Sequence, residues 1–181
     1  QDKETYSAGT SYSKKTKTSV YARLNYNWKS RYYLTVTGRY DGASNFAANN
    51  KWAFFPSAAL KWNISNENFL KDCNWIDDLS LRLSAGLTGN DAISTYRSLA
   101  TLSSTTGGYL FDGSQPVAFY RSRLDSPDLT WEKTTAYNVA IDWSMFKGRL
   151  NITAEAYKSK TTDLLMSLAV AAQTGYTSRW T

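Results

Sequence analysis

Hydrophobic and polar residues alternate one by one along several stretches of the chain. In residues 20–28 every second residue is apolar, and the positions between are mainly polar. Residues 32–40 repeat this alternation, and only residues 29–31 separate the two stretches. Successive side chains of a β-strand point to opposite faces, so a period of two predicts an antiparallel hairpin with one apolar and one mainly polar face.

Four further stretches carry the same alternation, most regularly where leucines alternate with small or polar residues after position 78. These stretches are residues 57–64, 79–88, 136–143 and 150–158. A two-stranded hairpin is marginal on its own in water, so we expect the six strands to form one sheet. The pattern predicts an all-β fold with an antiparallel, up-and-down order of about six strands.

The connections between these strands alternate between shorter and longer. Three stretches without sustained alternation, about 41–53, 90–134 and 163–181, are predicted to be long loops. In an up-and-down order, all three leave the sheet on the same side. Outer-membrane barrels show this asymmetry, with short periplasmic turns and long extracellular loops. A connection as long as 90–134 counts against a compact soluble domain unless the loop is functional.

Four aromatic residues lie at strand ends beside the shorter turns, and all four have the parity of the apolar face. They are Trp28, Tyr32, Trp62 and Trp143. Aromatic girdles of this kind mark the membrane–water interface of transmembrane barrels, whose strands need about 9–11 residues to cross the bilayer. We therefore predict that these four residues are membrane-interface aromatics.

The composition agrees with strands that face hydrocarbon on one side and water on the other. Hydrophobic residues make up 42% of the 181 residues and aromatic residues 15%, yet the mean hydropathy is a polar -0.48. Every second residue of a barrel strand faces the wet interior, which lowers the average. The longest nearly apolar run, residues 164–172, is about half the length of a spanning helix.

Several kinds of chemistry are disfavoured by the composition. The chain has no histidine and one cysteine, Cys73, so a Ser-His-Asp arrangement, the usual zinc sites and an intrachain disulfide cannot form. Asp77 and Asp78 are more simply a solvated turn than an acid–base pair. The net charge of +6 includes a cluster at Lys14, Lys15 and Lys17, but basic residues are otherwise scattered among acidic ones. We expect no catalytic site, metal, cofactor or nucleic-acid partner.

An ordered set of motifs resembles the barrel of SusC/RagA-like TonB-dependent outer-membrane transporters. The set begins with the hairpin and its Arg39-Tyr40-Asp41-Gly42 end and later includes Ser126-Pro127-Asp128-Leu129. Its segments are residues 23–46, 49–58, 75–82, 86–91, 126–132, 146–150 and 157–165. The sequence departs from the family at Asn45, where the family often has Arg, and at Ser126, where it often has Asn.

The resemblance implies an arc of about six strands of a 22-stranded transmembrane β-barrel that an N-terminal plug fills. It also implies location in the bacterial outer membrane, energising by TonB and a SusD-like lipoprotein lid. Such transporters import oligosaccharides or peptides, and they contact membrane lipid and lipopolysaccharide. We expect residues 1–181 to be a fragment of one barrel domain, without the plug and the TonB-contacting segment.

Aromatic and basic side chains of the longest loop are candidates for contacts at the extracellular mouth. They are Tyr96, Tyr109, Phe111, Tyr120 and Arg121. These side chains could stack on substrate, contact the lid, or only pack the loop. Cations with the parity of the polar face could meet substrate or line the wall against the plug. These are Arg23, Arg39, Lys61 and Arg82.

Two other functions fit parts of the pattern. The first is a soluble all-β carbohydrate-binding module that uses its tyrosines and tryptophans to stack on sugars. The second is a passive porin or adhesin barrel. The regular placement of aromatics at one level of the sheet favours the transporter, because the buried face of a soluble sandwich has no reason to order its tryptophans in this way.

Overall fold

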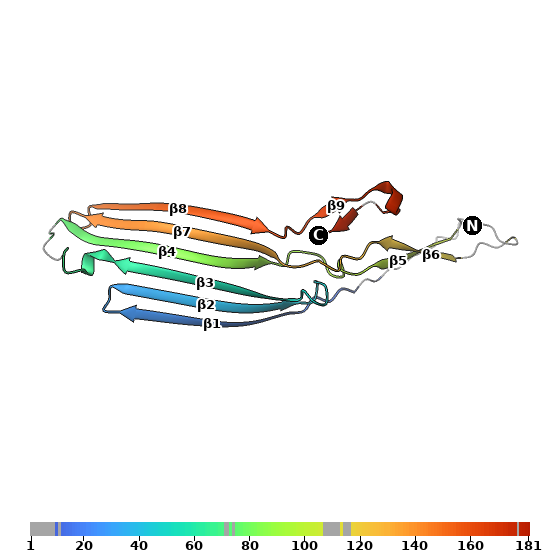
Figure 1. Cartoon of the computed structure of the whole chain (residues 1–181), viewed down its shortest axis with the longest axis horizontal. Helices are drawn as coiled ribbons and strands as arrows, with labels where there is room; N and C mark the ends of the chain where they lie inside the picture. Colours follow the sequence, from blue (N-terminus) through green and yellow to red (C-terminus); the bar gives the residue numbers. More distant parts are fainter. Residues whose placement is uncertain are drawn as a thin grey trace, which may run out of the picture.

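The chain forms one long six-stranded antiparallel sheet and two small hairpins (Figure 1). The computed structural model describes residues 10, 12–70, 73, 75–106, 113, 117–176 and 178–181. The sheet has the order β1-β2-β3-β4-β7-β8. Its strands are β1 (Lys17–Trp28), β2 (Tyr32–Ala43), β3 (Trp52–Asn63), β4 (Ile76–Asn90), β7 (Glu132–Met145) and β8 (Leu150–Thr162). The predicted all-β, antiparallel, up-and-down arrangement of six strands is confirmed.

The hairpins lie in two of the predicted loops. One pairs β5 (Thr101–Thr106) with β6 (Val117–Arg123), and the other pairs β9 (Ser167–Ala169) with β10 (Ser178–Trp180). Short 3-10 helices span Ile64–Asn66 and Ala172–Thr174. The β5–β6 hairpin projects beyond the end of the sheet where the long loops gather (Figure 1). We call this the loop end and the opposite end the turn end.

The register places the alternating apolar residues of all six strands on one face. Leu34 of β2 faces Leu60 of β3, which faces Leu83 of β4, which in turn faces Val139 of β7. We call this the apolar face. Leu83, Val139 and Ile141 are 38%, 46% and 45% exposed, so no described part of the chain covers this face. In the described residues, no helix is long and apolar enough to cross a membrane.

The buried core lies at the loop end rather than under the sheet. We call it the loop core, and it consists of Ala43, Phe46, Phe55, Ile93, Leu129 and Trp131. Trp131 is 0% exposed, and its ring centroid lies 4.9 Å from that of Phe46 and 5.4 Å from that of Phe55. Its indole N–H donates to the carbonyl oxygen of Lys51 at 3.2 Å. Loops that are distant in sequence are thus packed around one tryptophan.

Polar contacts reinforce the loop core. The side-chain amide of Asn45 donates to the carbonyl oxygens of Asp91, at 3.1 Å, and of Ile93, at 3.3 Å. Asp91 forms salt bridges with Lys15 at 2.9 Å and Lys17 at 3.2 Å. Burial alone would raise the pKa of Asp91, but the hydrogen bonds from these lysines outweigh it and lower the pKa. Lys15 and Lys17, at the start of β1, therefore hold the first strand against the loop after β4.

The structure corrects the extent of the predicted loops. The first, expected over 41–53, is shorter because Gly42 pairs with Trp52 and extends both strands. The loops at 90–134 and 163–181 contain the two hairpins. Serine and threonine occupy both faces of β5, so no apolar alternation signals this strand. Asn45 and Ser126, the two departures from the family pattern, are loop residues but are buried.

Candidate functional site

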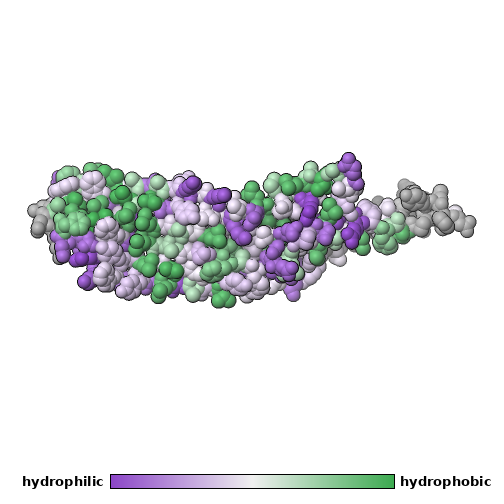
Figure 2. Space-filling view, viewed as in Figure 1, coloured by the Kyte–Doolittle hydropathy of each residue, from purple (hydrophilic) through white to green (hydrophobic). Residues whose placement is uncertain are grey.

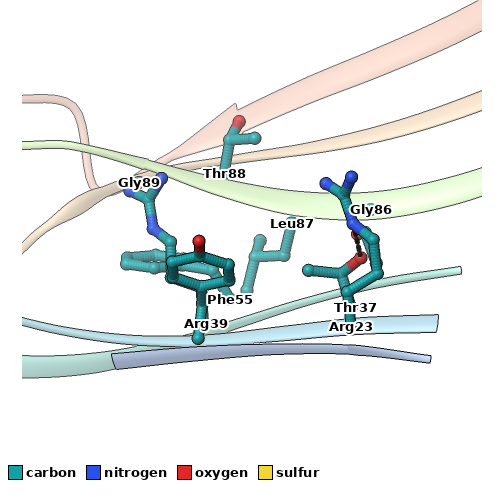
Figure 3. Close-up of a pocket in the computed structure, with 10 residues that line it drawn as sticks. Arg23, Thr37, Arg39, Phe55, Gly86, Leu87, Thr88 and Gly89 are labelled. Atoms are coloured by element: carbon teal, nitrogen blue, oxygen red, sulfur yellow. Dashed lines mark hydrogen bonds between the residues drawn. The ribbon is translucent and has the colours of Figure 1, made fainter. Parts of the chain in front are cut away.

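The face opposite the apolar face is polar, and it carries a cavity of about 510 Å³ near the loop end. Side chains from four strands line this cavity (Figure 3). They include Tyr21, Arg23, Thr37, Arg39, Phe55 and Thr88, together with Gly86 and Gly89. The sequence predicts Arg23 and Arg39 on the polar face, and the structure brings both side chains to this cavity.

The cavity exists because β3 and β4 separate toward the loop end. Their pairing begins at the turn end and stops at Ser57 and Gly86. The ring of Phe55 then lies against Gly89, where a Cβ atom would approach the ring to within 2.0 Å. Only glycine fits at this position without moving the ring, so the shape of the cavity depends on an absent side chain.

The cavity is electropositive. The Nε–H of Arg23 donates to the hydroxyl oxygen of Thr37 at 3.2 Å, and within the described residues Arg23 has no carboxylate partner. The guanidinium of Arg39 lies over the ring of Phe55 and binds the carboxylate of Asp41, with an Nε–Oδ2 distance of 2.8 Å. Asp41 is fully buried. The site thus presents one free and one neutralised guanidinium beside hydroxyl groups, which suits ligands rich in hydrogen-bond acceptors.

The polar face farther toward the turn end is internally paired. Arg82 binds Asp142 in a bidentate ion pair, with N–O distances of 2.7 and 3.0 Å. The hydroxyl of Thr153 donates to the same carboxylate at 3.0 Å. Lys61 lies directly opposite Arg82 in the register, and Asp142 balances part of their charge. The four cations expected on this face therefore differ in their partners. Among the described residues, Arg23 is the one that lines the cavity without an acidic partner.

The structure does not bring the predicted mouth contacts together with this cavity. Tyr96 lies in the loop after β4, whereas Tyr120 and Arg121 are neighbours on β6 and point to opposite faces of the projecting hairpin. Tyr120 and Tyr96 are both exposed. Tyr109 and Phe111 lie outside the described residues. Any contacts of the hairpin are thus made beyond the end of the sheet.

The four predicted interface aromatics lie together at the turn end. Ring centroids are 5.6 Å apart for Trp28 and Tyr32 and 6.0 Å apart for Tyr32 and Trp62, with the second pair stacked. Trp143 lies 6.1 Å from a further tryptophan, Trp75. We call Trp28, Tyr32, Trp62 and Trp143 the turn-end belt.

One carboxylate, which the sequence did not single out, organises the turn-end belt. Glu67 accepts hydrogen bonds from the indole of Trp62 at 3.2 Å, the hydroxyl of Tyr32 at 2.9 Å and the guanidinium of Arg31 at 3.0 Å. The hydrogen bonds from Trp62 and then Tyr32 lower the pKa of Glu67; burial opposes them less strongly, and the charge of Arg31 adds a smaller lowering. Glu67 lies in a connection without periodicity, so its only sequence signal is its place soon after Trp62.

A second aromatic group lies at the loop end of the apolar face. The rings of Tyr40 and Trp52 are stacked 5.1 Å apart. Trp52 lies over Gly42, where a Cβ atom would approach the ring to within 2.7 Å, and Phe54 lies over Gly38. Because these two glycines have no side chain, the rings of Trp52 and Phe54 can approach the backbone closely. We call Tyr40, Trp52 and Phe54 the loop-end belt.

One face of the molecule mixes hydrophobic and hydrophilic surface. Figure 2 shows hydrophobic patches over the strands, the largest hydrophilic patches where the loops gather, and a smaller hydrophilic patch at the turn end. The sheet thus combines an apolar face that has an aromatic belt at each end with a polar face that carries an electropositive cavity.

The comparisons agree with one another. The family model described as "TonB dependent receptor-like, beta-barrel" matches residues 2–180. TonB-dependent receptor P26 of Formosa agariphila is 39% identical over 161 residues, which cover 89% of this chain and 16% of the relative. TonB-dependent receptor SusC of Bacteroides thetaiotaomicron is 38% identical over 169 residues, which cover 92% of this chain and 17% of the relative. The chain therefore spans about a sixth of the length of these relatives.

Solved structures agree as well. A structure of the RagAB peptide transporter superposes with a TM-score of 0.79 at 30% identity, covering 92% of this chain and 18% of that chain. The RagAB peptide importer in its "open-open" state gives a TM-score of 0.80 at the same identity and the same coverage. The chain belongs to the TonB-dependent receptor-like β-barrel family, as a SusC/RagA-like segment of the barrel wall.

Proposed function

We propose that this chain is part of the wall of an outer-membrane importer that takes up oligosaccharides or peptides. The observation that carries the proposal is the uncovered apolar face between two aromatic belts. A soluble binding module would have to cover this face, since a continuous exposed apolar surface of this kind favours association with a membrane or a partner.

The spacing of the belts supports a bilayer-spanning orientation. On β2, Tyr32 of the turn-end belt and Tyr40 of the loop-end belt are separated by eight residue steps, roughly 26 Å along the strand. With the strand tilt of about 40° found in such barrels, this corresponds to about 20 Å of depth. The apolar band of outer-membrane barrels is about 25 Å tall between its girdles. The turn end then faces the periplasm, and the loop end faces the outside of the cell.

The polar face becomes the wall of a water-filled interior in this orientation. Its paired charges, such as Arg82 and Asp142, stiffen the wall without presenting a free charge. The cavity with Arg23 faces the interior near the extracellular end, where incoming substrate or a plug would meet it. Such a wall has a binding role, and we assign it no catalytic step.

The projecting hairpin is the proposed contact with substrate or with a SusD-like lipoprotein lid. Tyr120 and Arg121 offer an aromatic ring and a cation on its two faces, and Tyr96 lies on the loop that leads to it. Aromatic and arginine side chains are the residues that most often anchor such interfaces. Energy for uptake would come through TonB, by way of parts of the protein outside this chain.

Cysteine accessibility tests the orientation of the wall in the full-length protein, embedded in proteoliposomes or whole cells. Cys73 is first replaced by serine, and single cysteines are placed at Leu81, Leu83 or Ser84. Leu83 and Ser84 are adjacent but face opposite sides of β4, which makes them a matched pair. We expect a membrane-impermeant thiol reagent to modify Ser84→Cys and to spare Leu81→Cys and Leu83→Cys. Modification of both leucine variants would overturn the proposal.

A further inference from the structure

The cavity beside Arg23 continues along the polar face toward the turn end. Two further hollows, each of about 280 Å³, follow it along β3 and β4. The first shares Ser57 and Gly86 with the cavity, and the second shares Ala59 and Ser84 with the first. The three hollows therefore form one continuous groove, which we call the wall groove.

Small side chains form much of the floor of the wall groove. They belong to neighbouring positions on the polar face of β3, β4 and β7, namely Ser57, Ala59, Ser84, Gly86 and Ala136. Longer side chains at these positions would fill the groove, since successive residues of one face lie only about 7 Å apart along a strand. The floor thus leaves room for a chain-like ligand that lies on the sheet.

The lining of the wall groove is positively charged, and it includes no acid among the described residues. Its four cations are Arg23, Arg39, Lys61 and Arg82. Asp41 and Asp142, which lie outside the lining, each form a salt bridge with one of these arginines. Arg23 and Lys61 have no salt-bridge partner within the described ranges. One uncompensated cation therefore lies toward each end of the groove.

The two uncompensated cations differ in what they can bind. The Nε–H of Arg23 donates to the hydroxyl oxygen of Thr37 (Figure 3), and its two terminal nitrogens make no hydrogen bond with the described residues. A guanidinium with free terminal nitrogens matches the two oxygens of a carboxylate. Lys61 offers a single ammonium, and Glu155 lies near it, hydrogen-bonded to Asn138 in the lining. Arg23 is thus the stronger anion site and Lys61 the weaker.

The register gives the spacing of the two cations. Arg23 pairs with Thr37, which pairs with Ser57, and Lys61 lies four residues beyond Ser57 on β3. Four residue steps along the strand and two strand spacings across the sheet separate the Cα atoms of the two cations by about 16 Å. An extended chain advances about 3.3–3.6 Å per residue, so about five residues reach from one cation to the other.

We propose that the wall groove binds carboxylates of the imported substrate, which makes the substrate an acidic chain. Arg23 would hold one carboxylate through charge-assisted hydrogen bonds, and Lys61 would attract a second one. Peptides carry carboxylates on aspartate and glutamate, and oligosaccharides carry them on uronic acids, so the shared chemistry has two sources. This inference rests on the proposed function, because import through the barrel is what brings substrate to the polar face.

Binding of five-residue probes to the purified full-length protein tests the proposal. The acidic probes are penta-aspartate, capped at both ends, and pentagalacturonate. Their neutral counterparts are capped penta-asparagine and the methyl ester of pentagalacturonate, and affinities are measured by isothermal titration calorimetry. The test variants are Arg23→Gln, Arg23→Lys and Lys61→Gln. Lys147→Gln is the matched control, because it removes one charge from the turn between β7 and β8.

We expect wild type and control to bind an acidic probe with equal affinity and to bind its neutral counterpart at least about tenfold more weakly. Arg23→Gln should weaken binding of the acidic probe roughly 10- to 100-fold, the loss of hydrogen bonds to a charged group. Arg23→Lys should lose less, and Lys61→Gln only about two- to fivefold. The acidic probe that binds identifies the source of the carboxylate. Binding of neither acidic probe, equal binding of acidic and neutral probes, or wild-type affinity in Arg23→Gln overturns the proposal.

A second readout separates this inference from the proposed function. Ser84 lines the wall groove, and Leu83 lies on the opposite face. In proteoliposomes, the acidic probe should slow modification of Ser84→Cys by the membrane-impermeant reagent, and the neutral probe should not. If Leu83→Cys is spared but no acidic probe slows the reaction of Ser84→Cys, the groove proposal is wrong and the barrel wall stands. If Leu83→Cys reacts, the orientation of the wall itself is wrong.

Discussion

Replacing Trp131 with alanine tests whether the loop core holds the extracellular loops in one arrangement. The side chain is fully buried between Phe46 and Phe55. Truncation of a buried large aromatic residue costs about 3–5 kcal/mol through lost transfer free energy and the cavity that remains. The indole also satisfies the carbonyl oxygen of Lys51, a hydrogen bond of about 1 kcal/mol. The rest of the sheet is not expected to open, because the side chains around Trp131 belong to the loops and to the loop ends of β2 and β3.

Hydrogen exchange in the full-length protein measures the effect. The amide of Ala47, which donates to the carbonyl oxygen of Leu129 at 3.4 Å, and that of Ala43, which donates to Lys51 at 2.9 Å, report on loop opening. A loss of 3–5 kcal/mol corresponds to exchange faster by roughly two to three and a half orders of magnitude, at about 1.4 kcal/mol for each tenfold change.

Two variants make this result specific. Trp131→Phe keeps an aromatic ring but removes the indole N–H, so we expect only about a fivefold acceleration. Trp28→Ala removes a half-exposed tryptophan at the opposite end of the sheet and should leave exchange in the loops unchanged. If Trp131→Ala exchanges within threefold of wild type at both reporter amides, the loops are held by something other than the loop core.

Three further predictions concern the cavity, an ion pair and the turn-end belt. Gly89→Ala forces a Cβ atom into the ring of Phe55 and should lower the free energy of unfolding by about 1–3 kcal/mol. Adding Phe55→Leu should recover part of this loss. An unaltered thermal midpoint for Gly89→Ala would contradict the close approach of the ring to Gly89. The pKa of Asp91 is lowered in the folded protein, so its contribution is present above the unfolded value of about 3.9 and disappears as pH falls through the folded value. The Ser44 amide donates to the carbonyl oxygen of Thr16, between the two lysines, at 3.0 Å. Its exchange should therefore be faster in Asp91→Asn than in wild type at pH 6, and the difference should disappear only as the pH falls below the unfolded value and through the folded one. A difference that grows with acidity would refute the sign. Fluorescence from the tryptophans of the turn-end belt should be quenched by lipids brominated near the headgroup and much less by lipids brominated at the chain ends, and the reverse order would place the belt elsewhere.

The six strands of the sheet could be predicted because their signal is local. In stretches such as residues 79–88, the polarity of each side chain indicates which face of the sheet it occupies. Only one pairing register of the strands then keeps all apolar residues on the same face. β5 could not be predicted in this way, because its serine and threonine residues fit either face of a hairpin. The alternation does not predict the loop ends of β2 and β3. Gly42 has no side chain to indicate a face, and its partner Trp52 lies in a stretch without sustained alternation.

The cavity was predictable only in part. The parity of Arg23 and Arg39 assigned both to the polar face, but their convergence with Phe55 depends on where the pairing of β3 and β4 ends. The role of Glu67 also depends on three contacts, with Arg31 in the turn before β2, with Tyr32 of β2 and with Trp62 of β3. Such contacts join residues that are far apart in sequence, and no periodicity records them.

The amino-acid sequence by itself determined a sheet with one apolar and one polar face, with long connections at one end and aromatic residues at the other. Those properties follow from the alternation of residues along each strand, which the backbone geometry turns directly into faces. Tertiary structure alone decided that the loops close around Trp131 and that Gly89 makes room for Phe55. The reason is that each of these depends on register and on contacts between segments, which are set by packing and not by any single stretch of the chain.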